Sequence, residues 1–195
     1  MGNTKEEILT VAVHLFARDG YEAVSVSRIA GELGMTKGAL YRHYQNKRDI
    51  FEHIVKRMEQ GDSEQAEKNN VPEEEMEKNP EKYQETTLKD FLEYSKSMFK
   101  YWTEDDFASS FRKMLTLEQF RNEEMQGLYQ QYLASGPVEY VKDLFRNMDI
   151  VDADYKTVRF YAIMYLYYSI YDGAQDKEKV IRQLETALNE MIKEF

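Results

Sequence analysis

Apolar residues recur at intervals of three and four along most of this chain. The first such run comprises Ile8, Val11, Ala12, Leu15 and Phe16. It follows the segment TKEE, in which Thr4 and Glu7 have the spacing of a capping box. This pattern predicts an amphipathic helix, and Gly20 lies where a left-handed residue would end it.

A second helical run follows Ser25, a good N-cap residue, and ends at Gly34. Its apolar positions are Val26, Ile29, Ala30 and Leu33. A short third helix is expected next, with Thr36 as its cap, and Asn46 would begin a fourth. Two short helices joined by a glycine-containing turn are typical of a helix-turn-helix, whose second helix enters the major groove of DNA N-terminal end first.

The third helix lies within MTKGALYRHY, residues 35–44. Small Gly38 would let its backbone approach DNA closely, at a cost of about 1 kcal/mol in helix stability relative to alanine. Leu40 should point inward. Donors to bases and phosphates would come from Thr36, Lys37, Tyr41, Arg42 and His43, with Lys47 nearby. The alternative is that each cation merely belongs to a solvated face.

Charge is distributed unevenly between this region and the rest of the chain. The formal net charge is −10, yet residues 35–48 contain four basic residues and no acidic one. A local positive patch on an acidic body suits a phosphate-binding module, because the acidic remainder would repel DNA and confine contact to one face.

An acidic segment divides the chain. We expect a linking helix from about residue 46 and then an exposed loop over about 62–86, where acids outnumber lysines and two prolines occur. The alternative for this segment is a metal site on Glu73, Glu74 and Glu75. Consecutive acids on a helix point in different directions, which disfavours that site.

Helical periodicity returns after residue 87 and continues to the end. Two C-terminal helices are expected at about 154–172 and 177–194. The segment FYAIMYLYYSIY is apolar nearly all round its helix and must be covered on several sides, by the monomer core or by a second copy of the chain. The fold class is therefore all-α, with about nine or ten helices.

Several classes of function are disfavoured by what the sequence lacks. It contains no cysteine, which excludes disulfides and thiolate metal sites. It also lacks an apolar leader and a run of about 18 apolar residues, so we expect a soluble, cytoplasmic protein without a membrane span. The three histidines, His14, His43 and His53, accompany no nucleophile motif and no phosphate-binding loop, so neither an enzyme nor a cofactor site is predicted.

The segment ILTVAVHLFARDGYEAVSVSRIAGELGMTKGALYRHYQNKRDIF, residues 8–51, resembles the tetracycline-repressor (TetR) family of bacterial transcription regulators. The resemblance implies that Ser25 and Arg28 contact the DNA backbone and that Tyr41 and Lys47 hold phosphates. The groove-facing positions it implies are Thr36, Lys37, Gly38, Arg42 and His43, with Lys37 as base reader. Tyr44 departs from the family pattern, in which phenylalanine is commoner, but its ring would still fill the core.

The resemblance also implies a DNA-binding domain over residues 1–48 and an effector-binding and dimerisation domain over 49–195. The two C-terminal helices would form a four-helix bundle in a homodimeric repressor, which a small apolar or amphipathic effector releases from a palindromic operator. Candidate effector-pocket residues are Tyr94, Met98, Trp102, Phe111, Met114, Tyr129, Tyr165 and Tyr168. The alternative is a DNA-binding dimer without an effector, which acts by recruiting partners.

Overall fold

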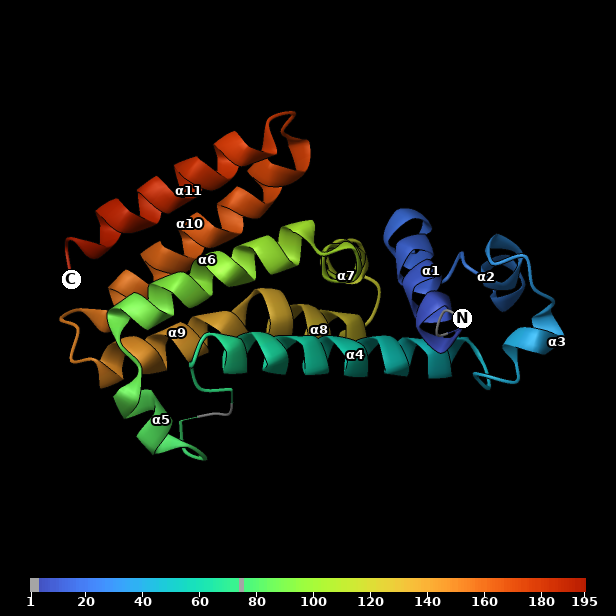
Figure 1. Cartoon of the computed structure of the whole chain (residues 1–195), viewed down its shortest axis with the longest axis horizontal. Coiled ribbons are helices and arrows are strands. Elements are labelled where there is room, and N and C mark those ends of the chain that lie inside the picture. Colours follow the sequence, from blue (N-terminus) through green and yellow to red (C-terminus); the bar gives the residue numbers. More distant parts are fainter. Residues whose placement is uncertain (1–3, 74–75) are drawn as a thin grey trace. The chain divides into compact units, whose positions relative to one another are not determined.

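Helices form from end to end of the computed structural model, which describes residues 4–73 and 76–195 (Figure 1). The described residues contain no strand. None of their helices is long and apolar enough to span a bilayer. The all-α prediction is confirmed.

The chain divides into two compact units, the first formed by residues 1–61 and 105–129 and the second by residues 62–104 and 130–195. The first unit therefore extends beyond the N-terminal segment 1–48 and takes in a distant piece of the chain. Helices α4 (Lys47–Lys68) and α8 (Glu123–Leu133) contribute residues to both units.

The first unit is built around its N-terminal helix. Its elements are α1 (Thr4–Asp19), α2 (Val26–Glu32), α3 (Lys37–Leu40), the start of α4, α7 (Asp106–Glu118) and most of α8. Helix α1 packs against α2 and α7, and α2 packs against α3. The apolar positions predicted for α1 are largely buried, with Ile8, Ala12 and Phe16 fully enclosed.

The second unit contains the C-terminal helices. Its elements are α5 (Pro80–Glu85), α6 (Leu88–Glu104), α9 (Ser135–Asn147), α10 (Ala153–Gly173) and α11 (Lys177–Ile192). Helix α10 packs against α6, α9 and α11, as Figure 1 shows. The bounds of α10 and α11 agree closely with the two predicted C-terminal helices.

The predicted acidic loop over 62–86 is wrong at both of its ends. Helix α4 continues to Lys68 because Ala66 is buried and because Gln65 and Asn69 hydrogen-bond to Ser97 of α6. In the turn that follows the helix, Asn70 adopts a left-handed φ of 57°. The Val71 N–H then donates to the Ala66 carbonyl over 3.1 Å, as in a Schellman motif.

The second difference in that segment is helix α5, where a loop was predicted. With it, the described residues contain eleven helices. The Asn79 side chain accepts a hydrogen bond from the Lys82 N–H, and Pro80 occupies the first turn. Tyr83 anchors the helix in the core with 1% of its surface exposed. The sequence contained this signal, since asparagine followed by proline is a helix start.

The predicted alternative of a metal site at 73–75 depends on Glu74 and Glu75, which lie outside the described residues. Elsewhere, within residues 4–73 and 76–195, no group of three His, Cys, Asp or Glu side chains is arranged to hold a metal ion.

Candidate nucleic-acid interface

The turn between α2 and α3 fixes the angle of the helix pair. Gly34 has a φ of +62°, a left-handed conformation that favours glycine. The Met35 N–H donates to the Ala30 carbonyl over 2.9 Å, which closes α2. The Thr36 hydroxyl oxygen then accepts a hydrogen bond from the Ala39 N–H over 3.1 Å, and this cap starts α3 within two residues of the turn.

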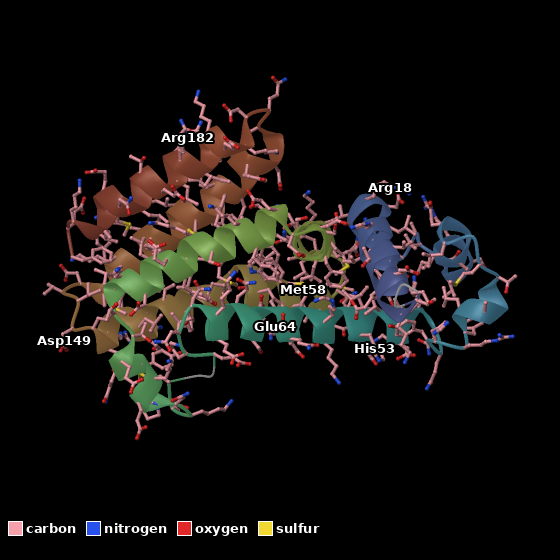
Figure 2. All side chains as sticks on the ribbon, viewed as in Figure 1. Arg18, His53, Met58, Glu64, Asp149 and Arg182 are labelled. Carbon is pink, nitrogen blue, oxygen red and sulfur yellow. The ribbon has the colours of Figure 1, made fainter. Side chains whose placement is uncertain are left out.

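Two buried residues fix α3 in place although the helix is only four residues long. Leu40 is fully buried, and Tyr44 is 2% exposed. Burial raises the pKa of Tyr44 to about 12, so its hydroxyl stays protonated and donates to the Lys5 carbonyl over 3.3 Å. Its ring also packs edge to face on His53 of α4, which is labelled in Figure 2, with centroids 5.0 Å apart. This packing therefore adds to the few backbone hydrogen bonds that so short a helix can form.

The outward side of α3 contains most of the predicted DNA contacts. The exposed residues are Thr36, Lys37, Gly38, Tyr41 and Arg42, and His43 is half-buried. The Lys37 ammonium lies 5.6 Å from the centre of the Tyr41 ring. No ion pair joins Lys37 or Arg42 to an acid in the part of the chain that the structure describes. Both cations are thus available to a phosphate or a base edge.

Gly38 has open space around it. A Cβ atom added there would meet no other atom within 4 Å, and its φ is not left-handed. The fold therefore does not itself require glycine at this position.

Ser25 and Arg28 lie together at the start of α2. The Ser25 hydroxyl oxygen caps the helix by accepting from the Arg28 N–H over 3.2 Å. The guanidinium of Arg28 lies 2.9 Å from the carboxylate of Asp19 at the end of α1. Both side chains are exposed, and the ion pair orients the guanidinium.

Lys47, at the first turn of α4, is held by the loop between α1 and α2. Its ammonium donates to the Tyr21 carbonyl over 2.9 Å and lies 4.2 Å from the centre of the Tyr21 ring. It is also 3.7 Å from a carboxylate oxygen of Glu22. With these partners Lys47 fastens the loop to α4, and 22% of its side chain remains exposed.

Arg48, a cation of the predicted positive patch, is neutralised by acids of its own unit. Its guanidinium donates to both carboxylate oxygens of Glu124 and to Glu52. The hydrogen bonds from Arg48 hold the pKa of Glu124 below its usual range. Arg48 therefore links α4 to α8 inside the first unit.

Glu118 is a supporting residue that the sequence pattern did not reveal. Its buried carboxylate accepts a hydrogen bond from the Tyr21 N–H over 3.1 Å, beside Gly20. The partners are 97 positions apart in the chain, and no local spacing relates them.

The eight predicted pocket residues fall into both units. Phe111, Met114 and Tyr129 are buried in the first unit. The second unit contains Tyr94, Met98, Trp102, Tyr165 and Tyr168. Among these, Trp102 and Tyr168 are buried, whereas Tyr165 on α10 is 42% exposed.

Comparison with known proteins identifies the helix pair. A family model described as "Bacterial regulatory proteins, tetR family" matches residues 8–54. This N-terminal segment is thus of the TetR type. The match comprises α1, α2, α3 and the start of α4, the elements that build the helix-turn-helix.

Curated proteins match this chain over a segment of similar length. The HTH-type transcriptional regulator AcrR of Shigella flexneri is 41% identical over 51 residues, which are 26% of this chain and 24% of that protein. An HTH-type transcriptional regulator of Staphylococcus aureus (strain USA300) is 40% identical over 53 residues, which are 27% of this chain and 29% of the relative. The match thus spans about a quarter of the length of each relative.

Solved structures resemble the fold of the whole chain at low sequence identity. The SmeT–triclosan complex aligns with a TM-score of 0.71 at 16% identity and covers 98% of this chain and 91% of that one. A TerR/AcrR-family transcriptional regulator from Aquifex aeolicus aligns with a TM-score of 0.69 at 18% identity and covers 98% of both chains. A putative regulator from Saccharomonospora viridis in complex with choline aligns at 0.67 and 18% identity, covering 99% of this chain and 97% of that one. These likenesses concern the fold.

Proposed function

We propose that this protein is a DNA-binding transcriptional regulator in which the N-terminal tip of α3 enters the major groove. The observation that carries the proposal is the open space around Gly38, flanked by the exposed donors Lys37 and Tyr41. The fold does not require glycine at position 38. Gly38 follows Lys37, which forms no ion pair among the described residues, at the start of the second helix of the pair. This arrangement suits close approach of a duplex.

Each predicted contact has a role in this arrangement. Lys37 reads a base edge, and Tyr41 and Lys47 hold phosphates. Ser25 and Arg28 contact the DNA backbone at the start of α2. The remaining groove-facing residues are Thr36, Gly38, Arg42 and His43. Lys47 can serve a phosphate with its remaining N–H while it fastens the loop.

A homodimer would place two such helices on one face of the duplex. Helix α10 exposes apolar residues at positions three or four apart, with one adjacent pair, which together form the kind of stripe seen at helix-packing seams. This seam comprises Tyr155, Val158, Ala162, Tyr165, Leu166 and Ile170. Pairing of α10 and α11 with a second copy would cover it, and half-sites about 34–36 Å apart would match a palindromic operator.

The proposed regulator is a repressor that a small molecule releases. The likeness in fold to proteins solved with triclosan and with choline supports an effector site in the helical body. An effector that binds one conformation of the body better than another shifts the population of DNA-binding forms. The protein would act in the cytoplasm, where bacterial chromosomal DNA is found.

DNA binding is tested by fluorescence anisotropy with the DNA upstream of the protein's own coding region and with scrambled DNA of equal length. We expect preference for the upstream fragment and a loss of affinity in Lys37→Ala and Tyr41→Phe. The matched control is Lys100→Ala, which removes an exposed lysine from α6. Unchanged affinity in the two α3 variants would overturn the site assignment.

The alternative regulator, a DNA-binding dimer without an effector, makes a different prediction. No compound in a broad library would then raise the melting temperature of the body or lower its affinity for the operator. A compound that does both supports the ligand-responsive repressor.

A further inference from the structure

The second unit contains a carboxylate with one buried oxygen that accepts no hydrogen bond from the described residues. The Oδ1 atom of Asp62 on α4 is shielded from solvent, and no hydrogen bond joins it to another group in the described part of the chain. Burial raises the pKa of Asp62 to about 7. A native fold rarely leaves such a group without a partner, because burial without a hydrogen bond is destabilising.

Three lysines of the second unit form contacts with groups other than Asp62. Lys96 pairs with Glu93 on α6, over 2.9 Å. In the same unit Lys82 donates to Asn70, and Lys142 pairs with Glu139. Burial is the cause of the shift in the Asp62 pKa, with no lysine or arginine opposing it.

Asp62 lies on the side of α4 that faces α6. Gln65 and Asn69, which follow it by three and seven positions and therefore share its face, are both within hydrogen-bond distance of Ser97 on α6. One turn before Ser97 lies Tyr94, whose pKa is raised by burial and by the charge of Asp62. The carboxylate is therefore close to the aromatic part of α6.

Three tyrosine rings lie one after another from Tyr94, whose pKa burial and the charge of Asp62 raise. The Tyr94 ring lies 6.1 Å from that of Tyr140, and Tyr140 lies 6.2 Å from Tyr83, measured between ring centres. The negative face of an aromatic ring attracts a positive charge, most strongly where water is excluded. A buried acid with tyrosines nearby thus combines a counter-ion with cation–π partners.

We propose that Asp62 is the counter-ion for a monocationic amphipathic ligand, of the organic ammonium class, that binds in the second unit beside α4 and α6. The ammonium pairs with the Asp62 carboxylate, and the apolar part of the ligand packs against the tyrosines. The inference rests on the proposed function, since this ligand would be the effector of the regulator. It commits the site to a positive charge, whereas the family resemblance left the charge of the effector open.

The test uses two probes of the same shape on the full-length protein. Benzyltrimethylammonium is cationic at every pH, and neopentylbenzene is its neutral carbon isostere. Affinities for both are measured by ligand-observed NMR titration with the unaltered protein, with Asp62→Asn and with Glu64→Gln. Glu64 is an exposed acid two positions away on the same helix and is labelled in Figure 2, so its substitution controls for a general change of charge.

We expect the unaltered protein and Glu64→Gln to bind the cation equally, and Asp62→Asn to bind it about thirtyfold more weakly or worse. Neopentylbenzene should show no such dependence on Asp62. Equal affinity of Asp62→Asn and the unaltered protein for the cation, or no binding of the cation to the unaltered protein, overturns the proposal. Asp62→Asn removes an unsatisfied acid, so we expect it to fold.

Failure of this inference is distinguishable from failure of the proposed function. Operator binding is measured on the same samples without ligand. Intact operator binding with no Asp62-dependent cation binding overturns the inference alone, whereas Asp62-dependent cation binding without sequence-specific DNA binding supports the ligand site and overturns the regulator.

Discussion

The side chain of Glu118, at the end of α7, accepts a hydrogen bond from the backbone N–H of Tyr21, in the loop between α1 and α2. The two atoms are 3.1 Å apart, and the Glu118 side chain is 3% exposed. Because the Lys47 ammonium donates to the Tyr21 carbonyl, both backbone polar groups of Tyr21 have partners. The loop that leads into the helix-turn-helix is thus fixed by α7 as well as by α4.

Replacement of Glu118 should therefore destabilise the first unit. Glu118→Ala leaves the part-buried Tyr21 N–H without its acceptor, and we expect a loss of about 1–3 kcal/mol in the free energy of unfolding. Glu118→Gln retains an acceptor and should lose less. Urea denaturation measures both, with Glu123→Ala as a control at an exposed acid on α8. Wild-type stability in Glu118→Ala would contradict the role of this contact.

Gly20 offers an independent test of the same loop. Its φ is +87°, and a Cβ atom added there would lie 2.9 Å from the Glu118 carboxylate. Gly20→Ala should therefore destabilise the protein by about 1–2 kcal/mol through the left-handed backbone alone, and displacement of Glu118 adds to it. The double variant Gly20→Ala/Glu118→Ala should show less than the sum of the two single effects.

These contacts show which part of the molecule the sequence could predict. The caps at Ser25 and Thr36 and the glycine turn at Gly34 depend on residues within five positions of each other, so their pattern is local and was identified. The Glu118–Tyr21 and Arg48–Glu124 pairs join segments far apart in the chain, and no periodicity relates them. Arg48 therefore looked like part of the positive patch, although Glu124 neutralises it.

The acidic segment shows a second limit of sequence patterns. Its charge and two prolines favour a loop, but burial of Tyr83 on α5 and of Ala66 on α4 provides tertiary contacts that override composition. Conversely, the bounds of α10 were predicted closely, although its apolar residues lie nearly all round the helix. The side of α10 that remains exposed is the one that α6, α9 and α11 do not cover. The sequence pattern does not show which side that is.

A comparison of two glycines tests whether Gly38 approaches DNA. Gly38 and Gly31 both lie in helices with no atom within 4 Å of an added Cβ, so alanine should stabilise each helix by up to about 1 kcal/mol. Gly38→Ala should nevertheless weaken operator binding by about tenfold or more, since the methyl group holds the backbone away from the groove. Gly31→Ala should leave affinity unchanged. Equal operator affinity for the two variants, measured by anisotropy, would place Gly38 outside the interface.

Lys37 and Lys47 should differ in what their loss affects. Lys37→Ala removes an exposed side chain without an ion-pair partner among the described residues, so affinity for the operator should fall by about 1–3 kcal/mol while stability changes by less than about 0.5 kcal/mol. Lys47→Ala also removes the bonds to the Tyr21 loop and should lower stability by about 1–2 kcal/mol. Paired urea denaturation and DNA titrations separate the two; unchanged stability in Lys47→Ala contradicts its fastening role.

The raised pKa of Asp62 predicts a specific dependence of stability on pH. Its pKa is about 7 in the folded protein and 3.8 in an ordinary aspartate, so between these values the folded state keeps a proton that the unfolded chain releases. Stability therefore falls as pH rises from about 4 to about 7 and is lowest above that range, by up to roughly 4 kcal/mol. Asp62→Asn should lack this loss and exceed the unaltered protein in stability at pH 8 but not at pH 4. Denaturation across this range, with Glu64→Gln as control, measures the difference. If the stability of Asp62→Asn and of the unaltered protein changed with pH in the same way, the pKa of Asp62 would not be raised by folding.

The exposed seam of α10 predicts how the protein assembles. Leu166 is 57% exposed within that seam, and Leu117 on α7 is 44% exposed outside it, so the two allow the same substitution in different surroundings. Leu166→Glu would place a charge in the centre of the proposed dimer contact and should convert the dimer to a monomer, whereas Leu117→Glu should not. A monomer binds one half-site, so Leu166→Glu should also lose the high affinity for a palindromic operator but keep weak binding to each half. Analytical ultracentrifugation gives the mass of each variant, and a Leu166→Glu protein that remains a dimer would move the contact to another surface.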